Sequence, residues 1–253
     1  PKIELIDTKK QPANSAILTP VLLSEIKKTI ENKKQVILFQ NRRGYAPYFI
    51  CETCGWIPHC KHCDVTLTYH KAKNMLSCHY CGTGYPIVNT CEACGKNSFK
   101  QKSFGTEQIE EKLMLSLPGV HVARMDYDNV KGKNEHDHLI QQFEQKQIDI
   151  LVGTQMVVKG LDFENVDLVG IVDADSLLNF NHYRVNERAF QMMEQVSGRA
   201  GRKNDNGTVI IQVSQLQHPI VQLVQQHDYF GFYNFEIQNR KQFSYPPFSR
   251  LMS

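Results

Sequence analysis

The residues of this sequence best suited to chemistry are eight cysteines, which form four CxxC pairs within 44 residues. The pairs are Cys51/Cys54, Cys60/Cys63, Cys78/Cys81 and Cys91/Cys94, and they include every cysteine of the chain. Two thiolates separated by two residues can bind one metal ion, and four thiolates complete a tetrahedral Zn²⁺ site. Four such pairs in one short window therefore predict two zinc sites rather than an isolated redox motif.

The spacing of the pairs favours a nested arrangement of the two sites. The two inner pairs enclose 14 residues, enough for the short hairpin of a zinc ribbon, and residues 65–69 alternate as a β-strand does. The outer pairs can then close around the base of that hairpin. The nested arrangement assigns one Zn²⁺ to Cys51, Cys54, Cys91 and Cys94 and the other to Cys60, Cys63, Cys78 and Cys81. Sequential and interleaved pairings are the alternatives.

Four histidines near the cysteines are possible substitute ligands. They are His59, His62, His70 and His79. Because the cysteines already suffice for two sites, a surface or supporting role is the simpler interpretation of these histidines.

The rest of the sequence argues against a membrane or secreted protein. No apolar run approaches the roughly 20 residues that span a bilayer, and no signal peptide opens the chain. A disulfide framework is disfavoured, because nothing marks the chain as secreted and paired CxxC motifs suit a metal better. We therefore expect no membrane partner, and reduced, metal-bound thiols in a reducing compartment.

Positive charge is unevenly distributed, although the net charge is only +3. Residues 1–50 carry nine Lys and Arg against four acidic residues, whereas three lysines balance three acids in residues 51–94. Two Zn²⁺ ions on eight thiolates would leave that second window with roughly four negative charges. The cysteine-rich window is therefore not the part expected to neutralise nucleic-acid phosphates.

Outside the cysteine-rich window, short apolar strands alternate with amphipathic helices. The predicted strands cover residues 36–39, 120–125, 148–152, 166–172 and 208–213. The predicted helices cover residues 20–34, 107–117, 135–143, 184–197 and 218–239. Continuous apolar strands separated by helices are typical of a parallel sheet covered on both faces. The sequence therefore predicts an α/β fold interrupted by an inserted zinc unit.

Residues 195–202 (QVSGRAGR) form a second group of chemical interest, at the end of a predicted helix. Arg199 and Arg202 each follow a glycine, so their guanidinium groups can approach phosphates closely. An arginine presented to a γ-phosphate stabilises the charge that develops during phosphoryl transfer. The alternative is an ordinary helix end, where glycine terminates the helix and the arginines complement its dipole. Taken alone, the octet does not decide between the two.

The octet resembles motif VI of superfamily 2 helicases, and two other segments resemble helicase motifs in the expected order. Residues 153–163 (GTQMVVKGLDF) resemble motif V, and residues 36–45 (VILFQNRRGY) resemble motif IV. This resemblance implies the second, RecA-like motor lobe of a helicase. It implies catalytic roles for Gln195, Arg199 and Arg202, positions near the nucleotide for Gly160 and Asp162, and DNA contacts from Asn41, Arg42, Arg43, Thr154, Gln155 and Lys159.

The cysteine insertion makes the resemblance narrower, because it is similar to that of the PriA family of bacterial replication-restart helicases. The insertion follows residues 41–47 (NRRGYAP), and residues 103–107 (SFGTE) and 245–251 (YPPFSRL) extend the similarity along essentially the whole chain. The resemblance implies an ATP-dependent 3′ to 5′ helicase that binds branched or single-stranded DNA at stalled forks. It also implies primosome proteins and single-stranded DNA-binding protein as partners, two Zn²⁺ ions, and a nucleoid-associated protein of the bacterial cytoplasm.

Two sequence features of an ATPase are missing from the chain. It has no phosphate loop (GxxxxGK followed by Ser or Thr) and no Asp-Glu box after a strand to hold Mg²⁺. We expect both on a first motor lobe that precedes residue 1, so ATP and Mg²⁺ should bind only together with that lobe. The chain alone is predicted to be inactive.

The predicted organisation is a discontinuous RecA-like lobe (residues 1–47 and 99–220), a zinc insertion (residues 48–98) and the beginning of a C-terminal domain (residues 221–253). The alternative function is a non-catalytic zinc-ribbon module that binds protein or nucleic acid on an α/β scaffold. The arginine pair of the octet distinguishes the two, since a binding module has no need of it.

Overall fold

The computed structural model describes residues 1–11, 17–41, 48–62, 67–70, 74–78, 81–102, 105–126, 130, 132–157, 163–178, 182–201 and 207–250. Seven residues of the predicted sites lie outside the described ones: Arg42, Arg43, Cys63, Lys159, Gly160, Asp162 and Arg202. The chain divides into two compact units. The sheet unit comprises Pro1–Asn41, Thr106–Leu178 and His182–Ser253, and the cysteine unit comprises Arg42–Gly105.

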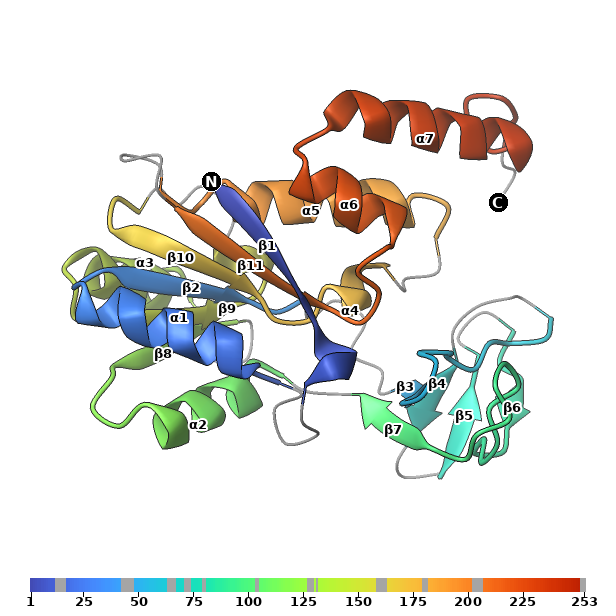
Figure 1. Cartoon of the computed structure of the whole chain (residues 1–253), viewed down its shortest axis with the longest axis horizontal. Coiled ribbons are helices and arrows are strands. Elements are labelled where there is room, and N and C mark those ends of the chain that lie inside the picture. The colour runs from blue at the N-terminus through green and yellow to red at the C-terminus, as the bar shows by residue number, and fades with distance from the viewer. Residues whose placement is uncertain are drawn as a thin grey trace. The chain divides into compact units, whose positions relative to one another are not determined.

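The sheet unit is built on six parallel strands (Figure 1). In spatial order they are β1 (Lys2–Asp7), β11 (Thr208–Val213), β10 (Val166–Ile171), β2 (Gln35–Phe39), β9 (Ile150–Gly153) and β8 (Val122–Met125). The four strands between the two edges are almost wholly buried, as their continuous apolar runs predict. The predicted α/β fold with a parallel sheet is therefore confirmed.

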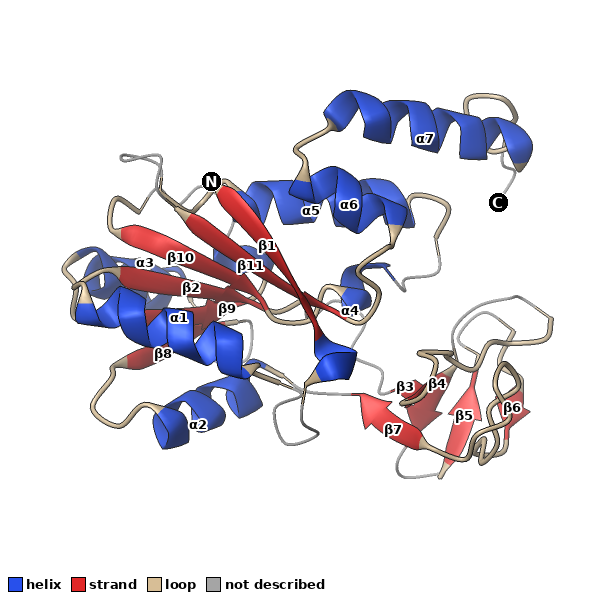
Figure 2. Ribbon diagram, viewed as in Figure 1, coloured by secondary structure: helices blue, strands red, loops and turns tan. Residues whose placement is uncertain are grey.

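Helices cover both faces of this sheet (Figure 2). The helices α1 (Pro20–Glu31) and α2 (Thr106–Ser116) lie on one face, and α3 (Lys133–Glu144), α5 (Val185–Ser197) and α6 (Pro219–Gln225) lie on the other. The other described helices are η1 (Thr8–Lys10), η4 (Gln155–Val157), α4 (Asp175–Leu178) and α7 (Tyr229–Gln242). None of the described helices combines the length and the apolar character needed to cross a membrane.

The start of α1 follows from local capping and one buried amide. The Thr19 hydroxyl accepts the Leu22 N–H at 3.3 Å, and Pro20 occupies the first helical position, as the sequence predicts. The buried Gln212 on β11 accepts the Thr19 N–H at 2.8 Å through its side-chain oxygen. The helix is thereby fastened to the end of a strand 193 positions away in the sequence.

Two elements of the sheet unit differ from the sequence-based prediction. The sequence does not predict the edge strand β1, because Ile3 and Ile6 are its only buried residues and polar residues interrupt its pattern. The helix predicted over residues 218–239 is two helices. The chain turns at His227, whose φ is 53°, and the Asp228 side chain then accepts the Gly231 N–H to cap α7.

The described residues of the cysteine unit form five short strands in two sheets. The strands β3 (Tyr48–Cys51) and β7 (Phe99–Lys102) form an antiparallel pair, and β4 (Thr68–His70), β5 (Met75–Ser77) and β6 (Gly84–Tyr85) form an antiparallel sheet. One buried cluster in this unit consists of Cys60, Leu67, Leu76 and Cys78. Two of these four residues are cysteines, so the thiols contribute packing as well as possible ligands.

Candidate functional site

Four sulfur atoms meet where β3 ends in the cysteine unit. The Sγ atoms of Cys51, Cys54, Cys91 and Cys94 all lie within 4.8 Å of one another. The Cys51 and Cys94 sulfurs are 3.6 Å apart, and so are those of Cys54 and Cys91. In a tetrahedral site with Zn–S bonds of about 2.3 Å, neighbouring sulfurs are about 3.8 Å apart. This outer thiol group therefore fits a Zn²⁺ ion in ligand type, number and spacing.

One kind of turn presents the cysteines in three of the four CxxC pairs. After Cys51, Cys78 and Cys91, the N–H four residues on donates to the cysteine carbonyl, and the cysteine N–H donates to the carbonyl five residues on. The residue four positions on is a glycine with φ of 80° (Gly55), 72° (Gly82) or 69° (Gly95). Such values favour glycine, so the sequence pattern CxxCG encodes the turn.

The thiols of the outer group influence one another's protonation. Burial tends to raise the pKa of the Cys51 thiol, but backbone N–H donors at Cys54 and Thr53 lower that pKa to about 6. A backbone N–H at Lys96 works to lower the pKa of Cys94, yet burial and the neighbouring thiols raise it to about 12. The metal-free group therefore retains protons, which a Zn²⁺ ion must displace on binding.

A second, inner thiol group is formed by Cys60, Cys78 and Cys81. The Cys60 and Cys81 sulfurs are 3.6 Å apart, and Cys63, the fourth cysteine predicted for this site, lies outside the described residues. The outer group contains the four cysteines that the nested arrangement assigns to one Zn²⁺ ion, and the inner group contains three of the four that it assigns to the other. In the described part of the chain, neither group includes a histidine.

A tyrosine hydroxyl supports the inner thiol group. The Tyr85 oxygen lies 3.2 Å from Cys60 Sγ and accepts the Lys61 N–H at 3.1 Å. Since that oxygen already accepts from a backbone donor, its own O–H is available for the sulfur. The contact with Cys60 is the main cause that raises the pKa of Tyr85. Hydrogen bonds to a ligand sulfur of this kind orient the ligand and tune a metal site.

Aromatic side chains of the cysteine unit pack against one another. The ring of Trp56 meets that of Phe99 at 6.2 Å between centroids, and Phe49 meets Tyr69 at 5.1 Å with the rings perpendicular. Packing of this kind accounts for Trp56 and Tyr69 without a nucleic-acid ligand.

Three of the predicted DNA-contacting residues lie at the carboxyl edge of the large sheet. Asn41 follows β2, and Thr154 and Gln155 follow β9. The two strands pair in parallel, so these residues are neighbours. The Asn41 side chain also donates to the Ser176 carbonyl at 3.4 Å, just beyond the end of β10. One edge thus collects polar groups from three adjacent strands.

A close approach of backbone segments explains the glycine that ends β9. A Cβ atom at Gly153 would lie 2.2 Å from the Val157 side chain and 2.8 Å from the Met125 carbonyl oxygen. Any other residue would displace η4, which carries Gln155. The glycine therefore sets the position of this part of the carboxyl edge.

Arg199 lies at the opposite, amino edge of the sheet. It follows the end of α5, and two residues later the Gly201 N–H donates to the Val166 carbonyl at 2.8 Å, where β10 begins. Gln195 stands one helical turn before Arg199 and is exposed. Because β10 has six residues, rising about 3.3 Å each, the two edges are about 20 Å apart. The described motif residues therefore form two separate groups.

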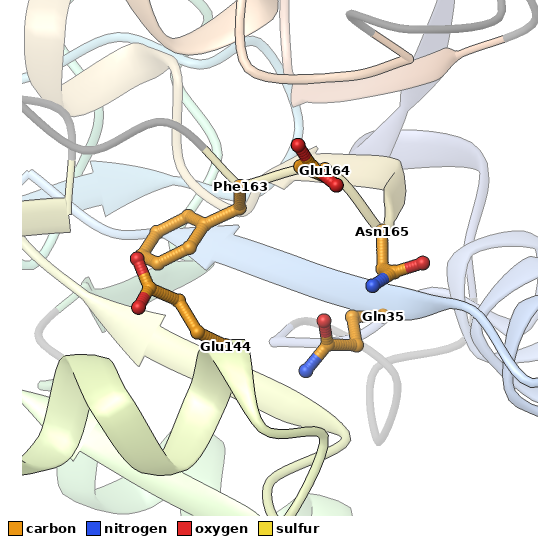
Figure 3. A pocket seen from close by; sticks show the side chains of 5 residues that line it. All are labelled: Gln35, Glu144, Phe163, Glu164 and Asn165. Carbon is orange, nitrogen blue, oxygen red and sulfur yellow. The ribbon is translucent and has the colours of Figure 1, made fainter.

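A pocket of about 280 Å³ also opens at the amino ends of the strands (Figure 3). It is lined by Gln35, Glu144, Phe163, Glu164 and Asn165. The Gln35 amide nitrogen is occupied by the Phe143 and Ile148 carbonyls, at 2.6 and 2.8 Å. With two glutamates in its lining, this pocket is unsuited to a triphosphate.

Sequence reasoning missed two groups that position site residues. One is the Tyr85 hydroxyl at the inner thiols. The other is the buried Asp175, whose carboxylate accepts both the N–H and the hydroxyl of Ser214 and so fastens α4 to the end of β11. These partners lie 25 and 39 positions apart in sequence, and no periodic pattern marks such pairs.

Two family models match separate parts of the chain. The family model described as "Helicase conserved C-terminal domain" matches residues 97–204. The model described as "PriA DNA helicase Cys-rich region (CRR) domain" matches residues 60–83, which contain all four inner cysteines.

Curated relatives extend the similarity to almost the whole chain. Replication restart protein PriA of Bacillus subtilis is 41% identical over 99% of this chain and 31% of its own length. The Haemophilus influenzae protein of the same name is 39% identical over 97% of this chain and 33% of its own length. The chain belongs to the PriA family. It spans about a third of the length of these PriA proteins. The match alone therefore does not assign the activity of a whole PriA protein to this chain.

Solved structures resemble the chain more distantly. The C-terminal domain of the DEAD-box protein Dbp5 covers 95% of this chain with 97% of its own length, at 16% identity and a TM-score of 0.46. The DEAD-box protein Mss116p, domain 2 bound to an RNA duplex, covers 88% of this chain with 57% of its own length, at 13% identity and a TM-score of 0.44.

Proposed function

We propose that this chain is the second motor lobe, with its zinc insertion, of an ATP-dependent 3′ to 5′ DNA helicase that acts at stalled replication forks. The observation that carries the proposal is the separation of the motif residues onto two edges of one sheet. Two separate edges let one group of residues meet the nucleotide while the other meets DNA, as a motor that couples hydrolysis to movement requires of its two ligands. Membership of the PriA family supports the fork as the place of action and primosome assembly as the outcome.

The amino edge is the proposed nucleotide edge. Arg199 and Gln195 lie there, and the resemblance to helicase motifs V and VI implies nucleotide roles for Arg202, Gly160 and Asp162 as well. A first lobe would hold ATP and Mg²⁺, and the two arginines would face the γ-phosphate from the other side. Their role is to stabilise the charge that develops on the transferred phosphoryl group.

The carboxyl edge is the proposed DNA edge. Asn41, Thr154 and Gln155 supply polar contacts there, and Arg42, Arg43 and Lys159 would add positive charge for the phosphates. The segment 154–165 connects this edge to the start of β10 at the amino edge. Closure of the two lobes on ATP, and their release after hydrolysis, would therefore move the DNA-contacting residues along one strand.

The cysteine unit is proposed to hold two structural Zn²⁺ ions, one in each thiol group. Four thiolates fill the tetrahedral coordination shell, so no open position remains for catalysis. The window's lack of net positive charge favours contacts with proteins over phosphate binding. Primosome proteins and single-stranded DNA-binding protein are the partners proposed for the complete helicase.

The test is DNA-stimulated ATP hydrolysis by the full-length protein. Arg199→Ala and Arg202→Ala should each reduce turnover about 10³-fold or more, with zinc content and circular dichroism unchanged. Lys27→Ala, which removes an exposed positive charge from α1, is the matched control and should hydrolyse ATP normally. Near-normal turnover in both arginine variants would leave only the zinc-ribbon binding module as a function for the chain.

A further inference from the structure

The helix α5 is held on two sides in the sheet unit. Ala189, Met193 and Val196 are fully buried on the side that packs against the sheet. Glu187, Phe190 and Glu194 follow one another at spacings of three and four residues, which places them on a single different face. The next position on that face precedes Arg199, the proposed nucleotide-edge arginine.

Each residue on this second face of α5 has a partner near or within α7. Glu187 pairs with Arg240, and Phe190 stacks on Phe232 with centroids 4.2 Å apart and ring planes 9° apart. Glu194 pairs with His227 at 3.2 Å, immediately before α7 begins. The contacts therefore follow α5 from its first turn to its last.

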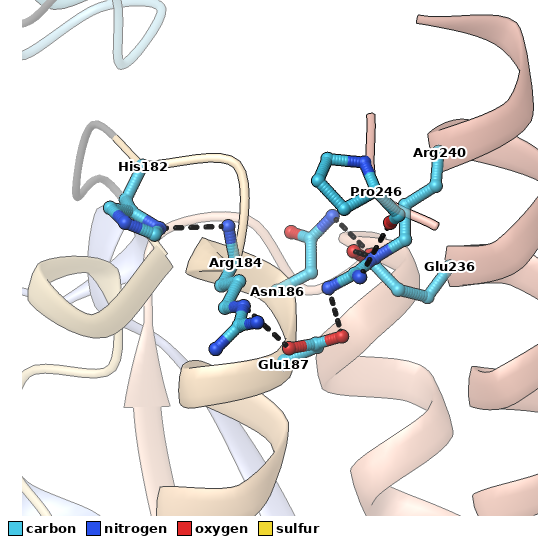
Figure 4. A network of polar contacts seen from close by, with 7 residues as sticks. All are labelled: His182, Arg184, Asn186, Glu187, Glu236, Arg240 and Pro246. Atoms are coloured by element: carbon cyan, nitrogen blue, oxygen red, sulfur yellow. Dashed lines mark hydrogen bonds and ion pairs between the residues drawn. The ribbon is translucent and has the colours of Figure 1, made fainter. Parts of the chain in front are cut away.

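Arg240 is the centre of the strongest of these contacts (Figure 4). Its guanidinium donates to Glu236 at 3.1 Å, to the Pro246 carbonyl at 2.9 Å and to Glu187. It also lies 5.4 Å from the centre of the Tyr183 ring. Arg240 and Glu236 are only 9% and 5% exposed, so this network is shielded from solvent and its geometry is closely specified.

A second hydrogen bond joins the same two helices at this point. The Asn186 side chain on α5 donates to Glu236 on α7 at 3.3 Å. The first turn of α5 is thus fixed to α7 by two side chains, whereas the last turn is fixed by the more exposed His227.

We propose that α7 is a clamp that positions α5 and, through it, Arg199, so that Arg240 is a positioning residue for ATP hydrolysis. A helix of 13 residues is about 20 Å long and moves as a rigid rod, so loosening its first turn displaces the group at its end. A displacement of about 1 Å at a catalytic group can lower a rate about 100-fold. This inference rests on the role of Arg199 proposed above.

The experiment measures single-turnover ATP hydrolysis by the full-length, DNA-bound protein. Arg240→Met keeps the apolar stem of the side chain and removes its charge, and it should lower the rate about 10- to 100-fold with ATP affinity little changed. His227→Gln loosens only the exposed end and should lower the rate about 2- to 5-fold. This milder variant serves if Arg240→Met does not fold.

The matched control is Arg124→Met. Arg124 on β8 pairs with Glu110 at 3.2 Å and lies 4.0 Å from Asp126, so it is also a shielded arginine between two carboxylates of the sheet unit. These carboxylates belong to α2 and to the end of β8 rather than to α5 or α7, so its loss should leave the hydrolysis rate unchanged apart from any change in stability.

The decisive measurement compares Arg240→Met in the unaltered protein and in the Arg199→Ala protein. If α7 acts through Arg199, Arg240→Met should cause no further loss of rate in the Arg199→Ala protein. An equal loss in both backgrounds would overturn the clamp, because Arg240 would then act independently of Arg199.

Hydrogen exchange separates failure of the clamp from failure of the proposed function. If Arg199→Ala alone hydrolyses ATP normally, the proposed function is wrong. Backbone hydrogen exchange then still tests whether α7 positions α5, because it does not depend on ATP hydrolysis. The backbone amide of Gly201, whose hydrogen bond to the Val166 carbonyl a displaced α5 would weaken, should exchange about tenfold faster in Arg240→Met than in Arg124→Met. Equal exchange in the two variants would overturn the clamp.

Discussion

The sheet unit and the cysteine unit fill their interiors in different ways. In the sheet unit, residues such as Leu38, Val169 and Ile211 are completely buried between two layers of helices. In the cysteine unit, two of the four residues of the apolar cluster are cysteines, and the strands have two to four residues each. Small units bury too little apolar surface to be stable alone, and a structural metal supplies the difference.

This difference shows that two kinds of sequence signal encode one chain. Period and apolar content encode the sheet unit, whose stability is spread over many side chains. Ligand spacing and turn glycines encode the cysteine unit, whose stability depends on its two predicted metal sites.

Removal of zinc is expected to have the largest effect, and it should unfold the cysteine unit while the sheet unit stays folded. A strong chelator should unfold the cysteine unit, because each structural site contributes on the order of 10 kcal/mol. The only tryptophan of the chain, Trp56, lies in that unit, whereas all described α-helices lie in the sheet unit. Tryptophan fluorescence should therefore change while the helical circular dichroism stays the same. A parallel loss of both signals would contradict independent stability.

Elemental analysis extends this prediction to the individual sites. The purified chain should contain two zinc ions, and Cys60→Ser should release one of them and leave the outer thiol group loaded. Loss of both ions from Cys60→Ser, or one zinc in the unaltered chain, would count against the nested arrangement.

A cavity in the sheet unit should have the next largest effect. Leu38→Ala removes a fully buried side chain from β2 and should lower the free energy of unfolding by about 2–5 kcal/mol. Its zinc content should stay at two. Urea unfolding followed by circular dichroism measures the change, with Leu115→Ala, at an 84% exposed position, as the control within about 0.5 kcal/mol. Zinc loss on Leu38→Ala would mean that the units depend on each other.

The smallest predicted effect concerns a single hydroxyl at the inner thiols. Tyr85→Phe removes the hydrogen bond to Cys60 and should weaken zinc binding at the inner group about tenfold. Competition with a chromogenic chelator measures it. Tyr69→Phe is the control, because the Tyr69 hydroxyl bonds Asn74 rather than a thiol. Equal affinities of the two variants would show that the Tyr85 contact does not tune the metal.

Much of the sheet unit was predictable because its signals are local. Five of the six strands were predicted from their apolar runs, and Thr19 with Pro20 marks the start of α1 in the sequence itself. The strand β1 escaped because an edge position leaves it only partly apolar. The turn between α6 and α7 escaped because it uses His227 in a conformation that usually calls for glycine.

Site prediction followed the same rule. Two cysteines separated by two residues and followed by glycine specify a ligand turn by themselves, and the seven described cysteines fall into two groups as the spacing suggests. Contacts such as Arg240 with Glu187 join residues 53 positions apart, and only the packing of complete helices brings them together. Such long-range pairs cannot be predicted from one sequence without an alignment.

The pairing of β3 with β7 has a consequence for the order in which this chain folds. The connection from β2 to α2, residues 40–105, is long, and closing a flexible loop is less favourable in entropy the longer the loop. Register between Tyr48 and Lys102 joins the two ends of the insertion, so the connection then behaves as a tether of about a dozen residues. Closure becomes easier by about 1–2 kcal/mol. Zinc bound during synthesis would hold the insertion folded and so keep its two ends joined. It would thus help the large sheet to fold, although that sheet contains no metal ligand of its own.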